Sequence, residues 1–144
     1  MYTGLLHAHH WLRYLALALI IMSLVKALMD LKKKDQEVKS MKLELYTMIS
    51  FHLQLLTGLI LFFVSNKVQT AMSDMGAAMK DADLRLALIE HPLMMIIGLI
   101  LITIGYVKLK AKTDMASYAK TVLIYYGIAT LIILSKIPTY SWGF

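Results

Sequence analysis

Two long stretches of this chain carry almost no charge, and they limit what it can fold into. Residues 45–66 contain no formally charged side chain, and residues 86–107 contain only Glu90. A helix that crosses the hydrocarbon core of a bilayer needs about 20 mostly apolar residues, because no water is present there to hydrogen-bond the backbone. Both stretches meet that length. The chain is therefore predicted to be an integral membrane protein.

Two further apolar stretches are interrupted by charge, because each carries a basic residue near either end. Long basic side chains can extend from such positions to the lipid headgroups, so we keep both as spans. Only 17% of the residues are charged, against about 25% in soluble domains. We predict an all-α fold, a single domain over 1–144 built as a bundle of four transmembrane helices. The predicted spans are about 5–29, 43–66, 84–107 and 117–137.

The basic residues predict the orientation of the bundle. Ten of the fifteen lie in or beside the first and third loops, while the second loop balances its charges. Because cytoplasmic loops carry an excess of Lys and Arg, both termini and the second loop are expected on the outer, periplasmic side. The net charge of +6 is then a topology signal. No basic residues cluster with aromatic residues on a soluble face, so a nucleic-acid partner is not expected.

All five histidines lie at or inside predicted spans: His7, His9, His10, His52 and His91. Ionisable groups inside a membrane are costly and mark a functional site by default, and imidazole is a common axial ligand of haem iron. His10 and His91 each lie about five residues into spans of the same direction, so similar depths are expected. His52 is expected roughly 10 Å deeper. One haem near the outer surface is therefore favoured over two.

A b-type haem needs two ligands on opposite faces and cationic groups for its propionates. His91 opposite His10, or opposite His7 on the same helix face, would supply the ligands. Arg13 and Arg85 lie toward the predicted outer side and could bind the propionates. Further residues have roles of the same kind in this interpretation: Gly58 and Gly98 for close approach, and Glu90 to orient a ligand or relay a proton.

Each of these features also has a plainer interpretation. The three histidines of the first span could simply be hydrated at the interface, and His52 could bond Gln54 or a neighbouring helix. Pro92 could serve only to shape its helix. Four aromatic residues are expected at the outer interface as an aromatic belt: Tyr2, Trp11, Tyr140 and Trp142.

Three runs of sequence resemble a known group of proteins: LLHAHHWLRYLAL (5–17), FHLQLLTGLILFFVS (51–65) and EHPLMMIIGLILITIG (90–105). They are similar to small bacterial four-helix membrane proteins of the cytochrome b-like type, over nearly the whole chain. The resemblance implies that His7, His9, His52 and His91 matter, and that His10 is less typical. A looser similarity to membrane haem A synthases implies that a histidine of the first helix pairs with His91 on a b-type haem. We do not infer the synthase reaction.

Three functions remain open at this stage. The first is a single-haem b-type cytochrome in a bacterial inner membrane, exchanging electrons with a quinone or a partner subunit, as a monomer or homodimer. His52 and Gln54 are then candidates for a quinone pocket or a proton path. The second is a copper-binding protein using the histidines, Glu90 and the outer-loop Met72, Met75 and Met79. The third is a cofactor-free accessory subunit. Catalysis, as a membrane oxidoreductase, is left open.

Overall fold

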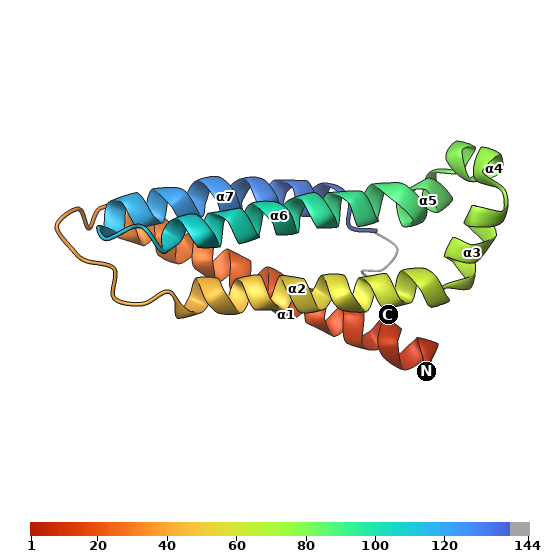
Figure 1. Ribbon diagram of the computed structural model, residues 1–144, viewed down its shortest axis with the longest axis horizontal. Coiled ribbons are helices and arrows are strands. Elements are labelled where there is room, and N and C mark those ends of the chain that lie inside the picture. The colour runs from red at the N-terminus through yellow and green to blue at the C-terminus, as the bar shows by residue number, and fades with distance from the viewer. Residues whose placement is uncertain (139–144) are drawn as a thin grey trace.

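Four long helices lie side by side in the computed structural model, which describes residues 1–138 (Figure 1). Three of them are α1 (Tyr2–Asp30), α2 (Lys42–Val64) and α7 (Met115–Ser135). The other runs continuously over Ala82–Leu109 and is made of α5 (Ala82–Arg85), the π-helical turn η1 (Leu86–Glu90) and α6 (His91–Leu109). Two short helices, α3 (Asn66–Ser73) and α4 (Met75–Lys80), connect α2 to α5.

All four long helices are long and apolar enough to cross a membrane, as the sequence predicts. Their bounds agree with the predicted spans to within a few residues. Large apolar side chains such as Leu15, Phe63 and Leu131 are exposed on the outer surface of the bundle. A contiguous apolar surface of this extent is typical of a protein covered by lipid. Tyr140 and Trp142 of the predicted aromatic belt lie outside the described residues.

The order of the helices around the bundle places α1 diagonally across from α6. α1 packs against α2 and α7, and α6 packs against the same two helices. Cofactor sites of helix bundles form in the core, between side chains of facing helices. A side chain of α1 and one of α6 can therefore meet across the bundle axis.

Small residues bring α6 and α7 into close contact. A β-carbon built on Gly98 would lie 2.5 Å from Ile133 Cγ1, and one built on Gly105 would lie 2.6 Å from Tyr125 Cβ. Within a bilayer, such close approach of helices provides the dispersion contacts that hold them together. This pairing fixes the position of α6, and with it the position of His91.

The segment between α2 and α6 was expected to be a loop but contains short helices. Asp74 and Asp81 cap α4 and α5, with side chains that accept hydrogen bonds from the amides of Ala77 and Leu84. Aspartate is among the preferred N-cap residues because its side chain satisfies an otherwise unpaired amide. The two aspartates were the sequence signal for these helices. A small core packs beneath them: Val68, Ala71, Ala78 and Leu88.

The wide turn η1 ends at Glu90, two residues before Pro92. Proline has no amide hydrogen, and its ring clashes with the carbonyl four residues earlier, so it disrupts the regular α-helical pattern. The amide of His91 donates to the carbonyl of Leu86, five residues back. Single π-helical turns inside α-helices occur frequently at functional sites. Here the turn immediately precedes a histidine that faces the interior of the bundle.

Candidate functional site

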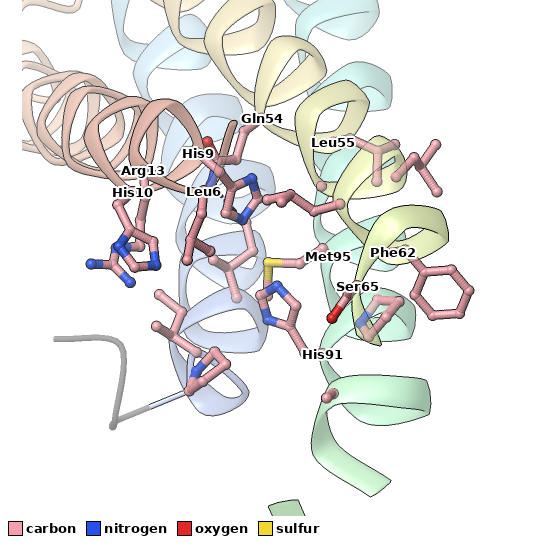
Figure 2. Close-up of a pocket in the computed structure, with 18 of the residues that line it drawn as sticks. Leu6, His9, His10, Arg13, Gln54, Leu55, Phe62, Ser65, His91 and Met95 are labelled. Carbon is pink, nitrogen blue, oxygen red and sulfur yellow. Dashed lines mark hydrogen bonds between the residues drawn. The ribbon is translucent and has the colours of Figure 1, made fainter. Parts of the chain in front are cut away.

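A cavity of about 220 Å³ lies inside the bundle, toward the end that carries α3, α4 and α5 (Figure 2). We call it the histidine cavity. Its walls come from α1, α2, α6 and the end of α7, and they are mostly aliphatic and aromatic. The polar or chemically active residues that line it are Tyr2, His9, His10, Arg13, Gln54, Ser65, His91 and Met95.

His9 is fixed by two residues of α2. Its Nδ1 lies 3.1 Å from Thr57 Oγ1, and its Nε2 lies 3.1 Å from Gln54 Nε2. The Thr57 hydroxyl also lies 3.0 Å from the carbonyl oxygen of Gln54, to which it donates its single proton. Nδ1–H of His9 therefore donates to Thr57, and the lone pair of Nε2 accepts from the Gln54 amide. This assigns the neutral Nδ1–H tautomer to His9.

Gln54 is held only loosely by this contact. Its amide oxygen, Oε1, is buried and makes no hydrogen bond among the described residues. A buried polar atom without a partner costs free energy and calls for a structural or functional reason. Moving this side chain away from His9 would break a single hydrogen bond. The Nε2 lone pair of His9 would then be available to another group in the cavity.

His91 enters the cavity from α6, where Figure 2 shows it beside Met95. Its Nδ1–H donates to the backbone carbonyl of Lys136, at 2.9 Å. The Nε2 atom is then the unprotonated one. His9 and His91 lie close enough to interact electrostatically across the cavity. Each ring is thus oriented by an acceptor on a different helix, through Nδ1.

The electrostatic character of the cavity is set by basic groups. Arg13 is only 7% exposed, and its guanidinium carbon lies 4.6 Å from the centre of the Tyr14 ring. His10 lies beside Arg13 in Figure 2. Among the described lining residues, none is acidic. The cavity is therefore suited to a group that carries negative charge.

A charged network braces the same end of the bundle just outside the cavity. The carboxylate of Glu90 accepts from Arg85 Nε at 2.8 Å and from Lys136 Nζ at 2.7 Å. Arg85 also donates to the carbonyl of Met79. Lys136 therefore binds Glu90 through its ammonium and His91 through its carbonyl. The network connects α5, α6 and α7 and helps to hold the His91 ring in place.

The structure brings together some of the predicted site residues and separates others. His9, His10, His91 and Arg13 line the histidine cavity. His7 and His52 are exposed, and the ring of His52 donates from Nδ1 to the carbonyl of Met48 on its own helix, at 2.8 Å. Arg85 binds Glu90 and does not line the cavity.

Two residues that fix the histidines were not identified from the sequence. Thr57 lies three residues after Gln54 and so on the same face of α2, which was the available signal. The carbonyl of Lys136 had no signal, because a backbone acceptor looks the same in every residue. Gly58 has a packing role here, since a β-carbon at this position would lie 3.1 Å from His9 Cε1.

Within residues 1–138, no three His, Asp or Glu side chains are grouped closely enough to hold a metal ion. The set considered for copper is dispersed, with His7 exposed and Glu90 engaged by two cations. A six-coordinate haem iron nevertheless needs only two axial protein ligands, and two opposed histidines can supply them. Comparison of the chain with family models, curated proteins and solved structures finds no match, so the geometry of the site stands alone as the guide to its function.

Proposed function

We propose that this protein is a b-type cytochrome-like membrane protein that holds one haem in the histidine cavity, between α1 and α6. His9 and His91 are the axial ligands. The observation that carries the proposal is the shared pattern of their hydrogen bonds: both donate from Nδ1 to an acceptor outside their own helix, on α2 for His9 and just after α7 for His91. Metal-ligating histidines almost always donate their second ring nitrogen in this way, which fixes the ring and leaves Nε2 for the metal.

The charge of the cavity supports an anionic ligand of this kind. Arg13 is buried at its edge, and a guanidinium forms strong paired hydrogen bonds with carboxylates such as the haem propionates. His10 is a second polar group on the same side. Arg85, which the sequence also suggested for the propionates, already binds Glu90. We therefore assign propionate binding to Arg13.

The size of the cavity sets a condition on binding. Its volume of about 220 Å³ is below the range of roughly 300–1,000 Å³ that is usual for pockets of larger ligands. Gln54 holds His9 Nε2 by one hydrogen bond, so its side chain has to rotate away before that nitrogen can bind the haem iron. The flexible side chain of Met95 is the other group whose movement would enlarge the space.

A bound haem would supply reversible one-electron transfer, and the protein would tune it through ligation, burial and the charge of Arg13. His9 and His91 hold their positions through Thr57 and the Lys136 carbonyl, while the apolar walls exclude water. The electron partner is a membrane quinone or a redox subunit. We further propose that the cavity lies in the outer half of a bacterial inner membrane, since the lysine-rich loops are at the opposite end of the bundle.

The test is an absorption spectrum of the detergent-purified protein, expressed with ample haem supply, before and after reduction with dithionite. We expect a sharp Soret band and split α and β bands on reduction, which identify a low-spin haem. His9→Ala and His91→Ala should each abolish the low-spin spectrum. His52→Ala is the matched control, because His52 is exposed and outside the cavity, and it should leave the spectrum unchanged. A featureless wild-type spectrum would overturn the proposal.

A further inference from the structure

A row of polar side chains follows one face of α2 through the membrane. The spacings of three, three, four and three residues place its members on the same side of the helix. We call it the polar row: Glu44, Thr47, Ser50, Gln54 and Thr57. The row faces α1, because Lys26 binds Glu44, Ser23 binds Thr47, and His9 binds Gln54 and Thr57. Polar groups are costly in a bilayer, so a row that continues over four turns calls for an explanation.

Glu44 forms the end of the row farthest from the histidine cavity. Its side chain is almost fully buried, and Oε1 lies 3.4 Å from Lys26 Nζ. Its other oxygen, Oε2, is buried and has no hydrogen-bond partner among the described residues. The hydroxyl of Tyr118, on α7, is also buried, and it lies close enough to the Glu44 side chain to interact with it. Lys26 Nζ lies 5.5 Å from the centre of the Tyr118 ring, so the three groups form one cluster.

The charges around Glu44 favour water over a metal ion as a further partner. Lys26 already supplies a positive charge, which it shares with Asp30 at 3.6 Å. A metal ion would be repelled by that ammonium. A water molecule between Oε2 and the Tyr118 hydroxyl would complete their hydrogen bonding without adding a competing ion. The titratable or charged groups that surround Glu44 are Lys26 and Asp30 of α1, Tyr118 and Tyr126 of α7, and Tyr106 of α6.

One end of the row lies near water, and the other lies at the histidine cavity. The Lys26 side chain is 34% exposed at the end of the bundle that carries residues 31–41, so it links Glu44 to that surface. Deeper in the bundle, the hydroxyls of Ser23 and Thr47 lie 3.0 Å apart. Thr47 and Ser50 donate to backbone carbonyls of α2, those of Leu43 and Thr47. Hydroxyl groups both donate and accept, so each would pass a proton onward by rotating away from its carbonyl.

Gln54 lies at the cavity end of the row. Gln54, whose Oε1 is unpaired, lies one helical turn beyond Ser50, which corresponds to about 6 Å along the helix axis. Bridging water would be needed to join the two side chains. Hydrogen bonding between helices would account for the Ser23–Thr47 contact. It does not account for the unpaired Oε1 of Gln54 at the cavity end of the row.

We propose that Glu44 is a proton-binding residue within the membrane and that the polar row carries protons between the water at the 31–41 end of the bundle and the histidine cavity. The step is a proton transfer, in which the Glu44 carboxylate accepts a proton from water and releases it to the next group of the row. No redox reaction is involved. The proposal does not depend on a bound haem and can fail or succeed separately from the proposed function.

The test uses the whole protein, without added haem, in liposomes that contain the pH dye pyranine. A potassium diffusion potential, set with valinomycin, drives protons inward. We expect the wild type to acidify the interior several-fold faster than protein-free liposomes. Glu44→Gln should reduce the rate to the protein-free level, and Ser50→Ala should lower it several-fold. Thr103→Ala is the matched control, because Thr103 makes the same kind of hydrogen bond to a carbonyl of its own helix, outside the row.

Ser50→Ala also separates a loss of proton transfer from a loss of folding. Among the described residues, the Ser50 side chain bonds only within α2, so its removal should leave the packing of the helices intact. A wild-type rate equal to that of protein-free liposomes would overturn the proposal, as would Glu44→Gln and Ser50→Ala proteins that conduct like Thr103→Ala.

A second measurement uses dicyclohexylcarbodiimide, which reacts with protonated carboxyl groups in apolar surroundings. Mass spectrometry should find an adduct on Glu44. A Glu44 that stays unmodified would contradict the proposal.

Discussion

The ring of His9 lies against the bare backbone of Gly58, so close that a β-carbon at residue 58 would stand 3.1 Å from His9 Cε1. α1 and α2 meet at this point, and the contact sets the rotation of the imidazole. Thr57 holds the same ring from the adjacent residue, through its hydroxyl group. Packing and hydrogen bonding therefore act together on one side chain, and each can be altered separately.

Gly58→Ala should displace the His9 ring by a few tenths of an ångström without preventing folding. Overpacking costs about 1–3 kcal/mol, and the low end of that range corresponds to about fivefold weaker haem binding. Haem titration followed at the Soret band measures this change. Gly127→Ala is the control, because its new β-carbon would lie 4.0 Å from Leu24 Cδ2, an ordinary contact. Equal haem affinity in the two variants would show that Gly58 does not position His9.

Gln54→Ala and Thr57→Val should change haem affinity in opposite directions. Gln54 competes for the His9 Nε2 lone pair, so its removal should strengthen binding about fivefold, the equivalent of one hydrogen bond of about 1 kcal/mol. Thr57→Val removes the acceptor that orients Nδ1, and losses of this kind weaken metal binding about 10–100-fold. The same Soret titration measures both. A loss of affinity in both variants would contradict the assigned roles.

Gly105→Ala should destabilise the bundle. The new β-carbon would lie 2.6 Å from Tyr125 Cβ, an atom fixed to the backbone of α7 that can move only with the helix. We expect a loss of about 1–3 kcal/mol in the free energy of unfolding, measured by denaturation in mixed micelles. Gly127→Ala again serves as the control. Unfolding of Gly105→Ala at the wild-type denaturant concentration would show that α6 and α7 are not packed at this distance.

Glu90→Ala should loosen one end of the bundle while leaving the rest intact. Arg85 and Lys136 would lose their common carboxylate. These pairs are partly exposed, and such pairs contribute at most about 1 kcal/mol each, so global stability should change little. Hydrogen exchange should increase over residues 82–90, next to His91. Unchanged exchange in that segment would mean that the network does not hold it.

The proposed orientation can be tested with single cysteines, because the natural chain has none. Lys80→Cys lies on α4, and Lys39→Cys lies in the connection between α1 and α2, at the opposite end of the bundle; both residues are exposed. A membrane-impermeant maleimide applied to intact cells should label Lys80→Cys and leave Lys39→Cys unlabelled. After cell lysis, both should react. The reverse pattern would invert the topology and place the histidine cavity at the cytoplasmic side.

The sequence predicted the membrane spans because their cause is local. A helix crosses the bilayer when about 20 consecutive residues are apolar, and this property can be read along the chain. The sequence also showed that the predicted spans contain ionisable residues, the histidines and Arg13, which are costly to bury in a membrane. Helix geometry favoured His10 or His7 as the partner of His91, and only the family resemblance favoured His9. The position of His9 in the structure depends on how α1 is rotated about its axis and on what α2 presents to it.

The sequence by itself therefore determined that the chain forms four membrane-spanning helices and carries histidines within them. Only the tertiary structure decided that His9 and His91 share a cavity, that His52 points outward, and that Thr57 and the Lys136 carbonyl fix the two rings. The physical reason is that these contacts join residues about 45 positions apart. They arise from the diagonal placement of α1 and α6 and from the close packing permitted by Gly58, Gly98 and Gly105.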